Sequence, residues 1–393
     1  MSYNFDQLPN RLPFYSSKWN MNTRPYQKGD LIPLWVADSD FSSPEAVKEA
    51  LMAHAEHGIF GYTGNPAQLT SSVVNWLKEK HNWEVDESWI VYPGSVVATL
   101  YAAVRALTEP GDKIILHDPV YPPFAGAVRG PEREVVWNPL KFDGTRYVMD
   151  LDNLRSLFTD TDKKPKMLIF CSPHNAAGRV WDREELEEMM DILDEHDCYI
   201  VSDEIHFDLV WDQKEHITLG RLGEKAMKRM VFASSASKSF NVAGLHASYA
   251  VIPNPELREK VMKAFTGVTM ASFVGKLGLE ACYTKSDEYL KEIKSYITGN
   301  LDLFIPAIND RCAPLKTIRP EGTYLVWVDC RELGLDQKEL IAWFMEEMKI
   351  RVNDGATFGP SGTGFVRFNM ACPRFLIEEA IERLEAGVAK FKK

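Results

Sequence analysis

Lys238 is the residue best placed for covalent chemistry. It lies in the run Ser234-Ser235-Ala236-Ser237-Lys238-Ser239, directly after the apolar segment 230–233. Small neighbours leave room for a bulky group beside the amine, and the hydroxyls can donate hydrogen bonds to an anion. An amine that loses its proton readily in such surroundings can form a Schiff base with an aldehyde. A lysine among serines is more often a solvated loop residue, so the run alone leaves both interpretations open.

Three further apolar runs each precede an aromatic or polar side chain that can bind a ligand. Run 113–116 is followed by Tyr121, run 167–170 by Asn175, and run 199–202 by Asp203 and His206. Open α/β sheets bind ligands beyond the carboxyl ends of their strands. A ring, an amide, a carboxylate and an amine at one such edge fit a charged aromatic cofactor.

Each of these residues also has an ordinary structural explanation. Asp203 would serve as a helix N-cap, and Asn175 as a turn residue beside Pro173. Tyr121, between two prolines, would simply pack, and His206 would be a satisfied core histidine. Each explanation is adequate for one residue alone. Four complementary groups after four strands are harder to explain in this way.

The turn at Gly94-Ser95-Val96 could bind a phosphate. It opens a helix predicted for residues 96–107, and backbone N–H groups at a helix start bind anions. The dinucleotide pattern GxGxxG and the P-loop pattern ending in GKS or GKT are both absent. A plain helix start capped by Ser95 explains the turn equally well.

The apolar runs must be positioned by a mostly parallel sheet. They alternate with amphipathic helices, such as the one predicted at 183–195, and this alternation is typical of βαβ units. Near Ser286 the pattern changes to long helices. A smaller α+β domain is then predicted from the strands 324–328 and 365–369, the helix 337–348 and a final helix from Phe375. We expect an arm at 1–45 that packs with a small domain at 286–393, and a large domain at 46–285.

Composition excludes several classes of function. The net charge of −11 argues against general binding to nucleic acid or anionic membranes. No run is long enough to span a bilayer, and the N-terminus lacks the features of a signal peptide. Six scattered cysteines without a CxxC pair argue against zinc or a disulfide framework. We therefore expect a cytoplasmic protein with free thiols and no metal.

Seven motifs occur in an order that is specific to one family. They are Trp35-Val36-Ala37-Asp38-Ser39-Asp40-Phe41, Phe60-Gly61-Tyr62-Thr63, Pro119-Val120-Tyr121, Ser172-Pro173-His174-Asn175, Ser202-Asp203-Glu204-Ile205-His206, Ser235-Ala236-Ser237-Lys238-Ser239-Phe240-Asn241 and Phe365-Val366-Arg367. Nearly end to end, the chain resembles the fold-type I pyridoxal-phosphate enzymes of aminotransferase class I/II. It is most similar to their C–S lyase branch, the cystathionine β-lyases and cystalysin.

The resemblance implies an aspartate aminotransferase-like fold, with a large PLP-binding domain built on a mostly parallel seven-stranded sheet and a smaller α+β domain. It also implies a role for each matching residue. Lys238 would bind pyridoxal 5'-phosphate covalently and act as catalytic base, and Arg367 would bind the substrate carboxylate. Asp203 would pair with the pyridine nitrogen, Asn175 with the phenolic oxygen, and Tyr121 would stack on the ring. The phosphate would be held by Gly94, Ser95, Val96 and Ser235, while His206 would complete the cofactor site and Ala37 would contact the substrate.

Two departures from the aminotransferase pattern favour the lyase branch. His206 stands where many aminotransferases have a tyrosine, and His246 where they have a phosphate-binding arginine. Three further residues, Ser39, Ser172 and Ala176, differ from the usual lyase pattern. These replacements leave the cofactor contacts intact and put the shape of the substrate pocket in question. Tyr62 matches a tyrosine supplied by the neighbouring subunit, which implies a homodimer with shared active sites.

The function expected from this resemblance is cleavage of the Cβ–S bond of L-cysteine S-conjugates, with L-cystathionine as the leading substrate. An aminotransferase would use all the same groups and differ only after the Cα proton is removed. A regulatory or scaffold protein that retains the cofactor is a second alternative. A nicotinamide- or metal-dependent enzyme is a third, which lacks any supporting motif.

Overall fold

The fold is built on a seven-stranded sheet. The computed structural model describes residues 3–159, 163–211, 214–268 and 270–391. The strand order is β2-β10-β9-β8-β7-β3-β4, in which β4, β3, β7, β8 and β9 run parallel and β10 is antiparallel to both neighbours. In this order the strands are Ile90–Val91, Tyr249–Val251, Met230–Ser234, Tyr199–Asp203, Met167–Cys171, Lys113–Asp118 and Glu134–Pro139. The predicted α/β fold with a mostly parallel seven-stranded sheet is confirmed.

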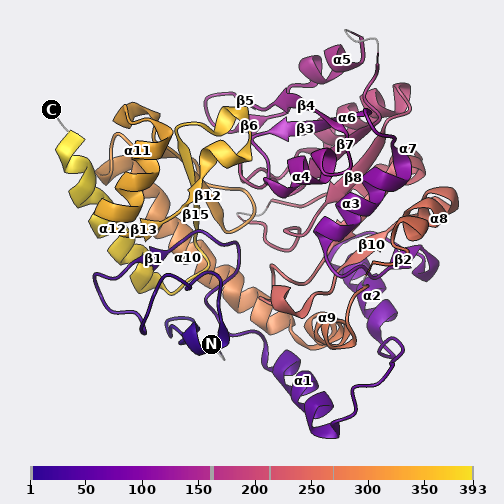
Figure 1. The fold of residues 1–393 in the computed structure, drawn as a ribbon, viewed down its shortest axis with the longest axis horizontal. Helices are drawn as coiled ribbons and strands as arrows, with labels where there is room; N and C mark the ends of the chain where they lie inside the picture. Colours follow the sequence, from indigo (N-terminus) through magenta and orange to yellow (C-terminus); the bar gives the residue numbers. More distant parts are fainter. Residues whose placement is uncertain (1–2, 160–162, 212–213, 269, 392–393) are drawn as a thin grey trace.

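Helices cover both faces of this sheet, because alternate residues of each buried strand point to opposite sides. Ile114 belongs to a core that includes α3, α4 and α8, whereas its neighbour Ile115 belongs to the core that includes α2, α6 and α9. Figure 1 labels these helices around the strands of the sheet. The helices around the sheet are α1 (Glu45–His57), α2 (Leu69–His81), α3 (Val96–Leu107), α4 (Pro123–Arg129), α5 (Leu151–Thr159), α6 (Arg183–Glu195), α7 (Glu224–Arg229), α8 (Pro255–Ala264) and α9 (Phe273–Lys285).

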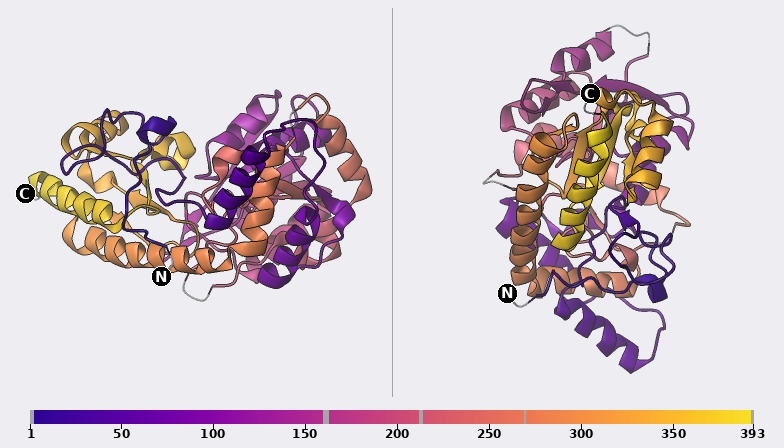
Figure 2. Two further views of the ribbon diagram at one scale, coloured as in Figure 1. Left: turned by 90° about the horizontal axis from the view of Figure 1, so that it is seen from below. Right: turned by 90° about the vertical axis from the view of Figure 1, so that its left-hand side faces the viewer.

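A second, antiparallel sheet is formed by the C-terminal part of the chain. Its order is β11-β12-β15-β14, and it packs with the helices α10 and α12. The elements are α10 (Asp287–Arg311), β11 (Lys316–Thr317), β12 (Leu325–Asp329), α11 (Gln337–Ala342), β14 (Asn353–Asp354), β15 (Phe365–Asn369) and α12 (Arg374–Val388). They lie together on one side of the molecule (Figure 2).

The N-terminal arm is attached to this C-terminal part. Strand β1 (Ile32–Pro33) pairs in parallel with β13 (Ile350–Arg351). In Figure 2 the first residues, in indigo, accordingly lie beside the yellow and orange C-terminal elements. The domain limits after residues 45 and 285 remain predictions.

The observed elements differ from the expected ones mainly at short or interrupted segments. The helix predicted at 337–348 is α11 followed by a π-helix at Trp343–Glu347. The strand predicted at 324–328 is β12, shifted by one residue. The edge strand β2 and its neighbour β10 were not predicted, because strands of two or three residues carry no periodic pattern.

Three wider features bear on function. No helix in the described ranges is long and apolar enough to cross a membrane. Within those ranges, no three His, Cys, Asp or Glu side chains gather as a metal site. All six cysteines are buried.

Candidate active site

A cavity of about 190 Å³ lies at the carboxyl ends of β7, β8 and β9. Cys171 and Asp203 are the last residues of their strands, and Ser235 follows the third. The cavity is lined by Ala37, Gly94, Ser95, Val96, Val97, Tyr121, Cys171, Asn175, Asp203, Ile205, His206, Ser235, Ser237, Lys238, Ala243, His246 and Ala247. Every predicted site residue is in this lining except Tyr62 and Arg367.

Lys238 brings its amine into the cavity from the turn after β9. The amine donates a hydrogen bond of 2.6 Å to the carbonyl oxygen of Ala37. Burial, and after it the positive charge of Arg367, lowers the pKa of Lys238 to about 8, while Asp38 and Asp203 act in the opposite direction. About a tenth of the amine is therefore unprotonated at pH 7, far more than for an ordinary lysine, and this free amine is the form that a nucleophile or base requires.

Asp203 presents a buried carboxylate to the same cavity. Its Oδ1 accepts a hydrogen bond of 3.1 Å from the backbone N–H of Ile205. Burial raises the pKa of Asp203 to about 7, against the effect of that N–H and of Lys238. No described Lys, Arg or His forms an ion pair with Asp203, although a buried carboxylate is stable mainly when paired. The site thus fits a ligand with a cationic ring nitrogen.

The start of α3 forms one end of the cavity. Oγ of Ser95 accepts a hydrogen bond of 3.1 Å from the N–H of Ala98, so Ser95 is the helix cap as well as a lining residue. Across from it, Oγ of Ser235 lies 2.6 Å from Oγ of Ser237. The hydroxyl of Ser235 also donates to the carbonyl oxygen of Ala247 over 2.7 Å, so the donors offered to a phosphate here are the backbone N–H groups at the helix N-terminus.

Arg367 lies one side chain behind the cavity wall, on β15. Its Nη1 donates to Oδ1 of Asn175 over 2.8 Å, and its Nη2 donates to the carbonyl of Trp35 over 3.1 Å. Burial lowers the pKa of Arg367 to about 10, which leaves the guanidinium charged at neutral pH. It can therefore attract a carboxylate that enters beside Asn175.

His206 and Tyr121 complete the predicted wall. Burial lowers the pKa of His206 well below its ordinary value, so this imidazole is neutral. Its ring meets that of Tyr324 edge-on, with 5.9 Å between ring centroids. Burial raises the pKa of Tyr121, so its phenol is un-ionised. Both rings are thus uncharged surfaces against which a planar ligand can lie.

Tyr62 is not part of this cavity. It lies in the loop between α1 and α2, where its side chain is fully exposed. The side chains of Ile59 and Phe60 in the same loop are also largely exposed. In this structure Tyr62 therefore does not contribute to the cavity of its own chain.

Sequence reasoning missed several residues around the cavity. Cys171 ends β7 and could have been found, because it directly precedes the motif that supplied Asn175. Tyr324 carried no signal, since its role depends on the contact with Ala37 described below. Asn353 pairs with Arg367 in the sheet, and its amide, oriented with the oxygen towards Arg367, accepts from Nη2 over 3.1 Å.

Comparison with known proteins identifies chains of the same architecture. The profile of the family "Aminotransferase class I and II" matches residues 30–384. Cystathionine beta-lyase PatB of Bacillus subtilis is 33% identical over 98% of this chain and 100% of its own. The crystal structure of cystalysin from Treponema denticola, which contains pyridoxal 5'-phosphate, has a TM-score of 0.94 at 33% identity and full coverage of both chains. A PLP-bound C–S lyase from Staphylococcus hominis has a TM-score of 0.89 at 27% identity, over 98% of each chain.

Proposed function

The chain belongs to the family of class I and II aminotransferases, and from that premise we propose that it is a PLP-dependent C–S β-lyase. Its substrates would be L-cysteine S-conjugates, with L-cystathionine first among them. Cleavage of the Cβ–S bond of L-cystathionine would give homocysteine, pyruvate and ammonia. The observation that carries the proposal is the cavity in which the amine of Lys238 and the carboxylate of Asp203 lie together.

The lining residues fit pyridoxal 5'-phosphate. Lys238 would bind its aldehyde carbon, and Asp203 would hold the proton on its ring nitrogen. Asn175 and Tyr121 would contact the phenolic oxygen and the ring face, with His206 beside them. The phosphate would lie against Gly94, Ser95, Val96 and Ser235, at the start of α3. When bound, the cofactor supplies an electron sink for the electron pair released at the substrate Cα.

The chain's own groups would then act on the substrate in a defined order. Arg367 would bind the α-carboxylate, beside the backbone of Ala37, and so fix the orientation of Cα. The free amine of Lys238, whose pKa is lowered to about 8, would take the Cα proton as general base. The thiol would leave from Cβ, protonated by Lys238 or by Tyr62 of a second subunit.

We further propose a homodimer whose subunits share their active sites. The exposed apolar side chains of Ile59 and Phe60 beside Tyr62 support this, because isolated loops rarely leave such groups in water. The proposed compartment is the cytoplasm, in keeping with the buried free thiols of Cys171, Cys198, Cys282, Cys330 and Cys372.

The alternative is an aminotransferase, since this family includes such enzymes and the same groups would serve both reactions. His206 supports the lyase proposal, because it stands where many aminotransferases have a tyrosine and resembles the histidine of the lyase branch. The two functions differ in whether a keto acid acceptor is needed.

The test uses the purified, PLP-loaded protein and L-cystathionine without a keto acid. We expect pyruvate and thiol to be released in equal amounts, and Lys238→Ala to lower the rate by at least about 10²-fold. Release of no thiol, together with turnover only when a keto acid is added, would refute the lyase proposal and establish transamination.

A further inference from the structure

The carbonyl oxygen of Ala37 accepts hydrogen bonds from two side chains that are distant in sequence. One is the amine of Lys238, at 2.6 Å, and the other is the hydroxyl of Tyr324, at 3.0 Å. Tyr324 is 1% exposed and does not line the cavity. Tyr324 therefore contacts the carbonyl oxygen to which the amine donates, but its side chain does not reach the cavity.

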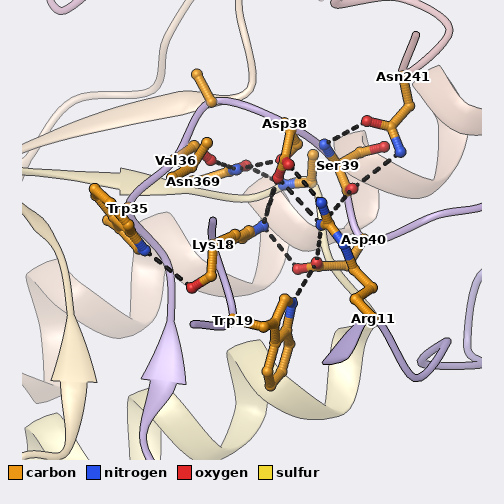
Figure 3. A network of polar contacts seen from close by, with 12 residues as sticks. Arg11, Lys18, Trp19, Trp35, Val36, Asp38, Ser39, Asp40, Asn241 and Asn369 are labelled. Carbon is orange, nitrogen blue, oxygen red and sulfur yellow. Dashed lines mark hydrogen bonds and ion pairs between the residues drawn. The ribbon is translucent and has the colours of Figure 1, made fainter. Parts of the chain in front are cut away.

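The backbone around Ala37 is held in place by Asn369. The side-chain nitrogen of Asn369 donates to the carbonyl oxygens of Val36, at 2.6 Å, and Asp38, at 2.7 Å (Figure 3). Its oxygen accepts from the N–H of Ala371, so the buried amide has partners on both sides. With both flanking carbonyls directed towards Asn369, the carbonyl of Ala37 is free to face Lys238.

We propose that Tyr324 is a positioning residue for the catalytic amine, because it shares with Lys238 the carbonyl that orients that amine. The proposal rests on the proposed role of Lys238 as general base. An amine that donates one N–H to a fixed carbonyl keeps its lone pair directed away from that carbonyl. The hydroxyl competes for the same oxygen and so weakens its hold on the protonated amine. When the amine leaves, Tyr324 keeps the buried carbonyl satisfied.

Other charged groups face the amine, and they are unchanged when the hydroxyl is removed. Asp203 faces it from β8, Arg367 from β15 and Asp38 from the segment next to Ala37. The imidazole of His206 is neutral there. The thiol of Cys171 and the phenol of Tyr121 are un-ionised, since burial raises the pKa of both. A change in the pKa of Lys238 in Tyr324→Phe therefore reports on the shared carbonyl.

The test measures the pKa of Lys238 in the cofactor-free protein by competitive labelling with acetic anhydride, read out by mass spectrometry. In Tyr324→Phe we expect this pKa to rise by about half a unit to one unit, because the carbonyl then binds only the amine. In Asn369→Ala we expect it to fall, because the carbonyl is no longer held against the ammonium. A merely structural role would not give shifts of opposite sign.

The matched control is Tyr249→Phe, which removes a buried hydroxyl bonded to Tyr283 and should leave the pKa of Lys238 unchanged. If Tyr324→Phe and Tyr249→Phe gave the same labelling curve as the unmodified chain, the inference would be overturned, even if Asn369→Ala did not fold. In the loaded enzyme, Tyr324→Phe should lower kcat with little change in KM. The acid limb of the pH profile of kcat should move to higher pH, by as much as the pKa of Lys238 rises. Because labelling needs neither cofactor nor substrate, its outcome is independent of whether the chain proves to be a lyase.

Discussion

The guanidinium of Arg367 donates a hydrogen bond from Nη1 to Oδ1 of Asn175 over 2.8 Å. Arg367 lies on β15 of the four-stranded sheet, whereas Asn175 follows β7 of the seven-stranded sheet. The bond therefore joins the two sheets beside the cavity. A guanidinium has five N–H donors, so it can keep Asn175 and still bind a carboxylate.

This arrangement predicts that lysine cannot replace Arg367. Arg367→Lys keeps a positive charge but loses the planar pair of donors that a carboxylate matches. We expect KM for L-cystathionine to rise by about 10–100-fold, with a smaller change in kcat, in steady-state kinetics. Arg229→Lys is a matched control, because Arg229 is also buried but pairs with Asp194 and Asp197 away from the cavity. An unchanged KM in Arg367→Lys would exclude this residue from carboxylate binding.

Asp203 is predicted to lower the stability of the cofactor-free protein at neutral pH. Its pKa is raised to about 7 by burial, so between about pH 4 and pH 7 the folded state keeps a proton that the unfolded state has released. Stability from this group therefore falls as pH rises through that window. We expect Asp203→Asn to be more stable than the unmodified chain by about 2–4 kcal/mol at pH 8, and equal to it at pH 4.

Urea denaturation at the two pH values tests this, with Asp208→Asn as the control. Asp208 accepts from Trp76, His81 and Ser239, so an amide there should destabilise the chain at both pH values. Asp203→Asn should also lose at least about 10²-fold in kcat, because no carboxylate remains to balance the ring nitrogen. Equal stability of Asp203→Asn and the unmodified chain at pH 8 would contradict the prediction.

Features that depend on local sequence patterns could be predicted from the sequence. The strands that end at Cys171 and Asp203 are continuous apolar runs, and the polar residue after each run marks the sheet edge, so the cavity followed from topology. Antiparallel β10 was not predictable, because three residues carry no periodicity. Tyr324 was not predictable for a different reason: its contact with Ala37 joins residues 287 positions apart. Such contacts are set by packing of the whole chain.

The buried amine of Lys18 should contribute strongly to the fold of the N-terminal arm, because it pairs with a residue of the same arm. Its Nζ lies 2.7 Å from Oδ2 of Asp40, and both side chains are completely buried (Figure 3). Lys18→Met leaves the carboxylate of Asp40 with Arg11 as its remaining cation. Removing one partner of a buried pair costs about 3–5 kcal/mol, and we expect a loss in this range by urea denaturation.

Lys28→Met provides the comparison within the same arm. Lys28 pairs with Glu382 at 3.1 Å, and both side chains are largely exposed to water. Exposed ion pairs contribute about 0–1 kcal/mol, so Lys28→Met should be nearly as stable as the unmodified chain. Equal effects of the two substitutions would mean that the Lys18–Asp40 pair does not stabilise the fold of the arm.

Tyr62 should act in the active site of the partner subunit, since it is fully exposed in its own chain and absent from its own cavity. Tyr62→Ala and Lys238→Ala should each lower activity strongly as homodimers. A heterodimer of the two would contain one site with intact Lys238 from one chain and intact Tyr62 from the other. Random pairing makes half of the dimers mixed, so co-expression should restore about a quarter of the unmodified activity.

Lys238→Ala co-expressed with Asp203→Asn should restore none, because both residues line the cavity of a single chain. If the Tyr62→Ala mixture were no more active than its two parents, Tyr62 would not be shared between subunits.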